Sequence, residues 1–200
     1  MTLTVAATPD AVRPNAAAIA AWDGPLYDRF ARFRHIVTTG LGAHGEHALR
    51  LYPPGPGQRV LDIGRGLGDS TQRIAGQIGP DGTVTGVDAA ARFIGTVRQE
   101  AAKAGVANVR FEVADIQAGV PGGPYELAFP RFGTMFFANP VAALRNVRSK
   151  LAPGGRLVMV VWRTRAENDW MYRAQTIVEQ LISRPEEYDE PTYKPGLRCF

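Results

Sequence analysis

Cysteine and lysine are scarce in this sequence. Cys199 is its single cysteine, and Lys103, Lys150 and Lys194 are its only lysines. One cysteine cannot form an intrachain disulfide or a cysteine-based metal cluster. The three histidines have no acidic residues around them in the pattern of a metal site, so no metal centre is predicted.

Long apolar runs are missing too. No stretch approaches the roughly twenty apolar residues that a membrane-spanning helix needs. The segment "AAAIAAW" (16–22) is too short, and polar residues and proline precede it, which argues against a signal peptide. The sequence therefore predicts a cytoplasmic protein without a membrane partner.

The composition is that of an ordinary globular protein. The 200 residues are 45% hydrophobic and 21% charged, enough for one domain with a single core. The net charge is +4, but the arginines are scattered apart from Arg29, Arg32 and Arg34. That group is typical of a solvated helix face, so no nucleic-acid partner is predicted.

The chain divides at "PPGPG" (53–57), which stops helix formation. Before it, three helices are expected, over 16–22, 25–36 and 42–52, with Asn15 as a cap of the first. After it, strands and helices alternate. Expected strands are 58–63, 83–88, 108–114, 125–130 and 156–162, and expected helices are 69–78, 90–104, 140–151 and 167–182.

Strands that are apolar on both faces, separated by amphipathic helices, indicate a parallel sheet with helices on both sides. We therefore predict an α/β fold with a doubly wound, Rossmann-like, mostly parallel sheet. The predicted units are a helical N-terminal cap (1–57), a ligand-binding domain (58–183) and an irregular tail (184–200). Ligands of such sheets bind beyond the carboxyl ends of the strands.

The glycines of "VLDIGRGLGDS" (60–70) follow the first strand at that end. They do not form the Gly-x-x-x-x-Gly-Lys-Ser/Thr loop of a nucleotide triphosphate site. They also miss the last glycine of the dinucleotide pattern, where Asp69 stands instead. Asp62 suits an ammonium better than a pyrophosphate, and Asp88 has the spacing of an acid that binds ribose hydroxyls. An amino-acid head with a ribose indicates S-adenosylmethionine, and a nicotinamide enzyme is a distant alternative.

Five motifs together resemble the class I S-adenosylmethionine-dependent methyltransferases, in the small-molecule group with methyltransferase-11/25-type domains. They are "VLDIGRGLGDS", "VTGVD", "FEVADIQ", "YELAFPRFGTMFFANP" and "LAPGGRLVMVVW", in family order over about residues 58–165. The N-terminal "NAAAIAAWDGPLYDRF" resembles the helical cap of that family.

The resemblance implies roles for individual residues. The glycine loop would pass under the methionyl part, Asp62 would hold its ammonium, and Asp88 would take the ribose hydroxyls. Asp115 would accept a hydrogen bond from the adenine amino group or, alternatively, cap a turn. The complete set of cofactor residues implied is Asp62, Gly64, Gly66, Gly68, Asp88, Ala89, Ala114, Asp115, Ile116 and Pro130.

Several aromatic residues have two interpretations. Tyr27 closes over the cofactor from the cap or is simply a core or surface tyrosine. Phe132, Phe136 and Phe137 are better explained by packing than by substrate recognition. No His–Asp pair can be read from the sequence, so no catalytic base is assigned.

Two residues depart from the family pattern. Arg65 stands where similar sequences commonly have a small residue, and a guanidinium near a sulfonium is unfavourable. We therefore expect Arg65 to weaken cofactor binding. Pro130 stands where serine is common and removes a backbone N–H at the end of a central strand. The alternative is that this N–H position has no partner in the sheet.

The end of the sequence also departs from the family, because the helix and antiparallel strand pair that usually follow are not recognisable in "KPGLRCF" (194–200). The fold is thus expected to lack that pair and to leave an apolar edge strand, which favours a homodimer or aggregation. The predicted function is methylation of a small molecule at O, N or C. The alternative is a methyltransferase-like protein that acts as a binding or structural module with weak or no catalysis.

Overall fold

The computed structural model describes residues 15–182, without the side chains of residues 165, 170 and 171. Its centre is a parallel sheet in the order β3-β2-β1-β4-β5. The strands are β1 (Arg59–Ile63), β2 (Thr83–Asp88), β3 (Val109–Val113), β4 (Tyr125–Pro130) and β5 (Leu151–Leu157). The strand order reverses beside β1, as expected for a doubly wound sheet.

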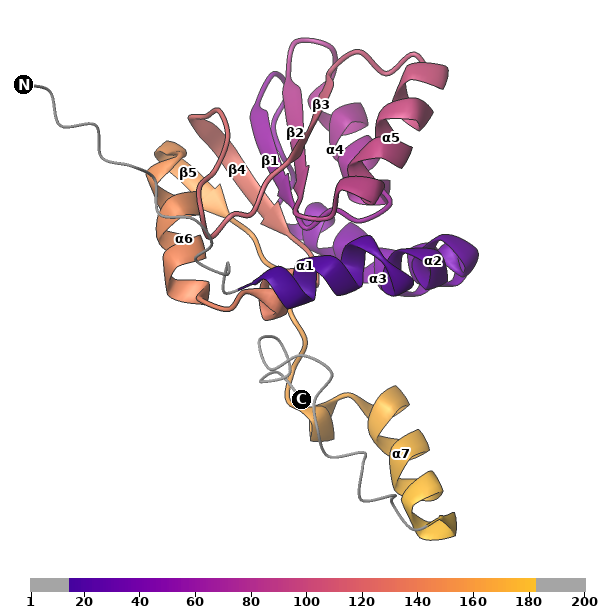
Figure 1. The fold of residues 1–200 in the computed structure, drawn as a ribbon. Coiled ribbons are helices and arrows are strands. Elements are labelled where there is room, and N and C mark those ends of the chain that lie inside the picture. Colours follow the sequence, from indigo (N-terminus) through magenta and orange to yellow (C-terminus); the bar gives the residue numbers. More distant parts are fainter. Residues whose placement is uncertain (1–14, 183–200) are drawn as a thin grey trace, which may run out of the picture.

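Helices cover both faces of the sheet (Figure 1). Apolar residues of β1 alternate between the two faces because successive side chains of a strand point in opposite directions. Val60 packs in a cluster with α4 (Asp69–Ile78), whereas Leu61 and Ile63 pack in a cluster with α6 (Pro140–Ser149). On the α4 side, α5 (Ala91–Lys103) packs on Phe111 of β3.

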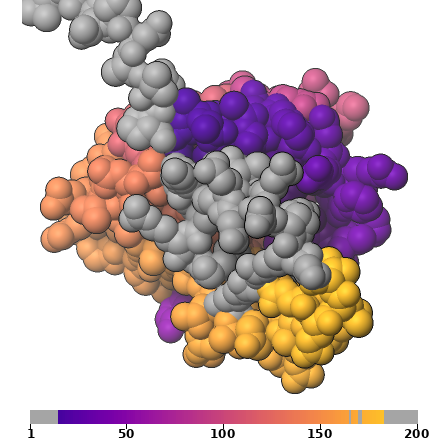
Figure 2. Space-filling view, turned by 60° about the horizontal axis from the view of Figure 1, so that its bottom comes forward, coloured from indigo at the N-terminus to yellow at the C-terminus, as the bar shows by residue number. Residues whose placement is uncertain are grey.

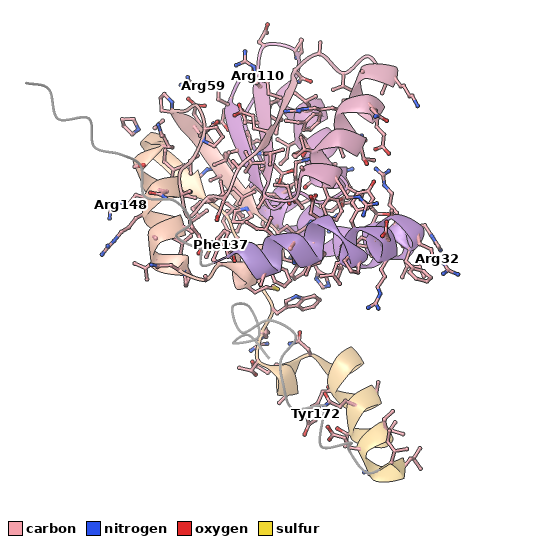
Figure 3. The ribbon with its side chains drawn as sticks, in the orientation of Figure 1. Arg32, Arg59, Arg110, Phe137, Arg148 and Tyr172 are labelled. Carbon is pink, nitrogen blue, oxygen red and sulfur yellow. The ribbon has the colours of Figure 1, made fainter. Side chains whose placement is uncertain are left out.

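The N-terminal cap consists of α1 (Ala16–Asp23), α2 (Pro25–Arg32) and α3 (Arg34–Leu51). Figure 1 shows these helices lying across one end of the sheet. Arg34 of α3 connects the cap to the sheet domain, since it donates hydrogen bonds to Glu100 of α5 and to the Leu67 carbonyl of the glycine-rich loop. Arg32, by contrast, lies at the far end of α2 and points away from the body (Figure 3).

Of two helix caps predicted from the sequence, one is present in the structure and one is not. Asn139 caps α6, because its side chain accepts a hydrogen bond from the Ala142 N–H at 3.0 Å. Asn15 precedes α1, but its side chain makes no capping hydrogen bond, so the predicted cap is wrong. The expected second helix ends at Arg32, and the third begins at Arg34 instead of residue 42.

The fifth strand begins earlier than predicted. β5 starts at Leu151, and its register with β4 shifts between Tyr125 and Leu127, which accommodates the Pro-Gly-Gly sequence. Pairing with β4 continues beyond the strand, as the Val160 N–H donates to the Pro130 carbonyl at 3.0 Å. Within the described residues β5 is an edge strand, as expected.

Beyond β5, a short 3-10 helix (Arg165–Glu167) leads to α7 (Asp169–Leu181), which stands apart from the layered body in Figure 1. No helix in residues 15–182 is long and apolar enough to cross a membrane. The predicted tail, 184–200, lies outside the described residues.

Candidate functional site

A cavity of about 260 Å³ opens at the carboxyl ends of the strands, beneath the cap helices. Its volume is just below the range of about 300–1,000 Å³ typical of small-molecule sites. In Figure 2 the cap helices (indigo) and the segment after β5 (orange to yellow) lie on different sides of this end of the molecule. Predicted cofactor residues that line the cavity are Gly64, Gly66, Asp88, Ala89, Ala114, Asp115 and Ile116. The predicted Asp62, Gly68 and Pro130 are not in its wall.

The loop after β1 depends on glycine at its first position. Gly64 has a φ of 63°, which L side chains rarely adopt. A Cβ there would lie 3.2 Å from the Gly133 Cα, so the loops after β1 and β4 approach backbone to backbone. This close approach shapes the cavity floor.

Asp62 lies behind this loop and is fully buried. Its Oδ2 accepts hydrogen bonds from Ser70 Oγ (2.8 Å) and Thr71 Oγ1 (2.6 Å), whereas its Oδ1 has no partner. Burial raises the pKa of the Asp62 carboxyl, against the opposing effect of these hydrogen bonds and of the nearby Arg65 charge. An unpaired buried carboxylate oxygen is costly, and such an oxygen suits a cationic ligand group.

The Arg65 side chain turns inward, beneath the loop. Its Nε donates to Thr71 Oγ1 at 2.9 Å, and its guanidinium lies 4.3 Å from the centre of the Phe111 ring. Only 3% of the residue is exposed, and burial lowers the pKa of its side chain to about 10. Gly68 and Gly86 make room for it, since a Cβ at either position would collide with the side chain.

Asp88, at the end of β2, joins the loops on either side of it. Its Oδ2 accepts from the Gly66 N–H and its Oδ1 from the Ala90 N–H, both at 3.0 Å. Burial raises the pKa of Asp88, and these two hydrogen bonds oppose the effect. Each carboxylate oxygen keeps a further lone pair for a ligand hydroxyl.

Asp115 and Ile116 follow β3. Asp115 Oδ1 accepts from the Gln117 N–H at 3.0 Å, so the carboxyl does cap a turn, while the residue also lines the cavity. Asn146 of α6 donates to the carbonyls of Ile116 and Gln117, which fixes this segment. Both interpretations of Asp115 are thus compatible with the geometry.

The cap supplies residues that sequence reasoning missed. Asn15, which precedes α1, and Trp22 of α1 line the cavity, and Asn15 Oδ1 and Trp22 Nε1 are buried without a hydrogen-bond partner among the described residues. Trp22 packs edge-on against Phe136, at 4.9 Å between ring centres. Tyr27 is not in the cavity wall, because it packs on Phe93 of α5.

Phe132, Phe136 and Phe137 all line the cavity and also pack against neighbours. Figure 3 shows Phe137 between α6 and the start of α1. Phe132 has a φ of 52°, an unusual conformation for a bulky residue, and stacks on Trp162 with ring centres 4.3 Å apart.

Pro130 is the last residue of β4 and the last one paired with β1, opposite Ile63. No pairing with β1 lies beyond it. On the other side the pairing continues from Arg131 to Val160, and Pro130 contributes its carbonyl, which accepts from the Val160 N–H, so this hydrogen bond does not need the N–H that proline lacks.

The four buried side-chain polar atoms without a partner among the described residues are those of Asn15, Trp22, Asp62 and Arg65. All except Asp62 belong to residues in the cavity wall, and Asp62 lies directly behind it. The unpaired atoms include both donors and acceptors, which suits a polar, partly cationic ligand.

Comparison with known protein families decides the assignment. A family model described as "Methyltransferase domain" matches residues 54–193. The chain belongs to this methyltransferase family. The match begins within the proline-rich segment 53–57 that precedes β1. The methyltransferase domain therefore covers the sheet and its loops, whereas α1 to α3 precede it.

Individual relatives found by sequence comparison are methyltransferases as well. The chain is 32% identical over 114 residues to aklanonic acid methyltransferase DauC of Streptomyces sp. strain C5, covering 56% of this chain and 52% of DauC. It is 36% identical over 107 residues to ubiquinone/menaquinone biosynthesis C-methyltransferase UbiE of Ectopseudomonas mendocina, covering 52% and 42% of the two chains. It thus spans about half the length of these curated relatives.

Among solved structures, magnesium protoporphyrin IX methyltransferase ChlM from Synechocystis PCC 6803, with bound SAM, has a TM-score of 0.61. That match covers 76% of this chain and 77% of ChlM at 18% identity, and so shows the shared fold. The Rossmann-like class I methyltransferase fold expected from the sequence is confirmed.

Proposed function

We propose that this chain binds S-adenosylmethionine in the cavity and transfers its methyl group to O, N or C of a small molecule. The observation that carries the proposal is the placement of three carboxyl groups near the carboxyl ends of the neighbouring strands β1, β2 and β3. Asp88 and Asp115 line one cavity, and Asp62 directly precedes Ile63, which lines it too.

The residues present fit this cofactor. The unpaired Oδ1 of Asp62 is the group for the ammonium, directly or through a water molecule, and the free lone pairs of Asp88 are those for the ribose hydroxyls. Asp115 and Ile116 would take the adenine, by a hydrogen bond and by packing. When bound, the cofactor supplies a methyl group on a positively charged sulfur, an excellent leaving group.

The chain's own residues then have to align the two reactants and keep water out. The cap and the segment after β4 do the second task together, because Trp22 of the cap packs edge-on against Phe30 of the cap and against Phe136, and all three rings line the cavity. Methyl transfer requires no general base if the acceptor arrives deprotonated.

A small acceptor is favoured by this enclosure. The aromatic side chains of the cap and of the segment after β4 line a space suited to a small molecule and not to a nucleic-acid strand. The names of DauC and UbiE refer to aklanonic acid and to ubiquinone/menaquinone biosynthesis, which indicates small-molecule acceptors for those relatives. The sequence also lacks the Asn/Asp-Pro-Pro-Tyr pattern of amino-methylating nucleic-acid enzymes after β4.

A thermal-shift experiment with S-adenosylmethionine, S-adenosylhomocysteine and NAD tests this proposal. A ligand present at about one hundred times its dissociation constant stabilises the protein by about 2.7 kcal/mol. We expect both adenosyl compounds to raise the melting temperature and NAD to leave it unchanged. A shift with NAD alone would contradict the proposal.

The alternative, a binding module with weak or no catalysis, is favoured by one observation. Arg65 places a charge beneath the cofactor loop where similar sequences have a small residue. No shift with either adenosyl compound would support this alternative over the enzyme.

A further inference from the structure

An ion pair lies between the end of β4 and the start of α4. Arg131 directly follows β4, and its Nη2 donates to Asp69 Oδ1 at 2.6 Å. The two side chains are only 12% and 29% exposed. Asp69 directly follows the last glycine of the cofactor loop, so the pair connects that loop to the strand that ends beside it.

Helix α3 is shaped around this pair. A Cβ at Gly45 would lie 2.8 Å from Arg131 Cδ, too close for an ordinary contact, whereas a Cβ at Gly42 would lie 3.4 Å from Asp69 Oδ2, an ordinary contact distance. Glycine inside a helix is less stable than alanine, so α3 loses stability to leave this space. The position of the arginine is therefore a built feature and not an accident of a mobile surface side chain.

Most of the hydrogen-bonding capacity of Arg131 is unused. A guanidinium carries five N–H groups, and among the described residues Asp69 is the partner of its side chain. Arg131 also lines the cavity. None of its nitrogens is among the buried side-chain atoms of the described residues that have no partner, so its remaining N–H groups are open to solvent and are available to an oxygen of a ligand in the cavity.

The wall near Arg131 is otherwise aromatic and apolar. Its next neighbour, Phe132, stacks on Trp162 at an interplanar angle of 24°, and Leu41 and Met135 also line the cavity. The φ of 52° at Phe132 is an energetically costly backbone conformation. The Phe132 N–H donates a hydrogen bond to the Val160 carbonyl at 2.9 Å, which holds the residue in this conformation. Flat apolar molecules suit such a wall.

We propose that Arg131 binds the reacting oxygen of the methyl acceptor, and that this acceptor is a planar, apolar molecule with an acidic enol or phenol group. The assignment rests on the proposed function. Arg131 selects the ionised oxygen, and Asp69 is a positioning residue that fixes the guanidinium. The oxygen forms its bond to the methyl carbon with its own electron pair, while the sulfur–carbon bond breaks and leaves a neutral thioether. No proton has to move, so the site needs no base.

Binding of two matched probes by the full chain tests this assignment. 2-Hydroxy-1,4-naphthoquinone carries an acidic enol, whereas 2-methoxy-1,4-naphthoquinone has the same frame without an ionisable oxygen. Calorimetry at pH 7, with and without saturating S-adenosylhomocysteine, gives the ratio of the two affinities. We expect the wild type to prefer the hydroxy compound by about tenfold or more, as charge-assisted hydrogen bonds imply.

Variants locate the preference. Arg131→Met should reduce the ratio to about one, and Arg131→Lys should retain part of it because the charge remains. Arg173→Met is the matched control, since Arg173 forms an exposed pair with Asp169 on α7, and it should leave the ratio unchanged. Affinity for S-adenosylhomocysteine, measured for each variant, reports whether the cofactor side remains folded.

The outcomes separate the two proposals. Wild-type protein that binds no S-adenosylhomocysteine contradicts the proposed function, while the probe ratio without cofactor still decides the role of Arg131. Equal affinities for the two naphthoquinones in the wild type, or an unchanged ratio in Arg131→Met, overturn the assignment of Arg131.

Discussion

The inward direction of the Arg65 side chain predicts that a substitution at Gly86 of β2 lowers the free energy of unfolding. A Cβ at this residue would lie 2.5 Å from Arg65 Cδ and 3.1 Å from Phe111 Cδ1. The arginine cannot move aside easily, because it is hydrogen-bonded to Thr71 and stacked on Phe111. Overpacking of this kind costs about 1–3 kcal/mol. We expect Gly86→Ala to destabilise the protein by about 2–3 kcal/mol, toward the upper end of that range.

The same substitution should be far less costly once the arginine is removed. In an Arg65→Cys background only the contact with Phe111 remains, so we expect Gly86→Ala to cost less than about 1 kcal/mol. Urea unfolding followed by circular dichroism gives the four free energies of unfolding of this double-mutant cycle. Gly76→Ala is the control, since no atom lies within 4 Å of a Cβ there, and it should stabilise α4 by up to about 1 kcal/mol. An equal cost of Gly86→Ala in both backgrounds would refute the steric argument.

Further predictions concern the cofactor, a helix cap, pH and association. If the Arg65 charge repels a sulfonium, Arg65→Cys should improve calorimetric affinity for S-adenosylmethionine about fivefold relative to uncharged S-adenosylhomocysteine, as about 1 kcal/mol implies; equal changes for both would reject that idea. Asn139→Ala should destabilise the protein by about 1 kcal/mol in urea, whereas Asn15→Ala should not cost a cap. Because burial raises the pKa of Asp62, the folded state binds its proton more tightly than the unfolded state, and this contribution to stability is lost as pH rises above the ordinary carboxyl pKa of about 3.9. The stability of Asp62→Asn relative to wild type should therefore increase between pH 4 and 7, and a constant difference would contradict the linkage. Within residues 15–182, β5 is an edge strand, and exposed Leu157, Met159 and Val161 lie at its end and just after it, which predicts self-association; a monomer in gel filtration at high concentration would count against it.

The central strands β1, β2 and β4 were predictable because they are buried on both faces and are mostly apolar. The expected 83–88 and 125–130 coincide with β2 and β4, and β1 differs by one residue. β5 could not be placed from its pattern, since its first residues include Pro-Gly-Gly, a sequence typical of a turn. Its pairing depends on the register shift opposite Tyr125, which only the folded sheet defines.

The site was predictable where it depends on chain order and not where it depends on packing. Acids at or just after strand ends meet at one edge of a parallel sheet, which is why Asp88 and Asp115 could be assigned. The direction of the Arg65 side chain depends on Gly86, which is distant in sequence, so only the structure shows it. The Arg131–Asp69 pair left one signal, Gly45 of α3, because glycine is unfavourable inside a helix. The signal is not specific, since Gly40 of the same helix has no atom within 4 Å of its Cβ position.

The Asp88 carboxylate joins the backbone at Gly66 to the backbone at Ala90 even without a bound nucleoside. Removing its carboxylate would therefore release Gly66 and Ala90 as well as a sugar contact, and a loss of affinity in such a variant would measure both effects at once. Mutation of Asp88 is thus a poor way to measure how much the ribose contact contributes to affinity. Ligands that lack one ribose hydroxyl leave the two backbone hydrogen bonds of Asp88 intact and measure that contribution alone.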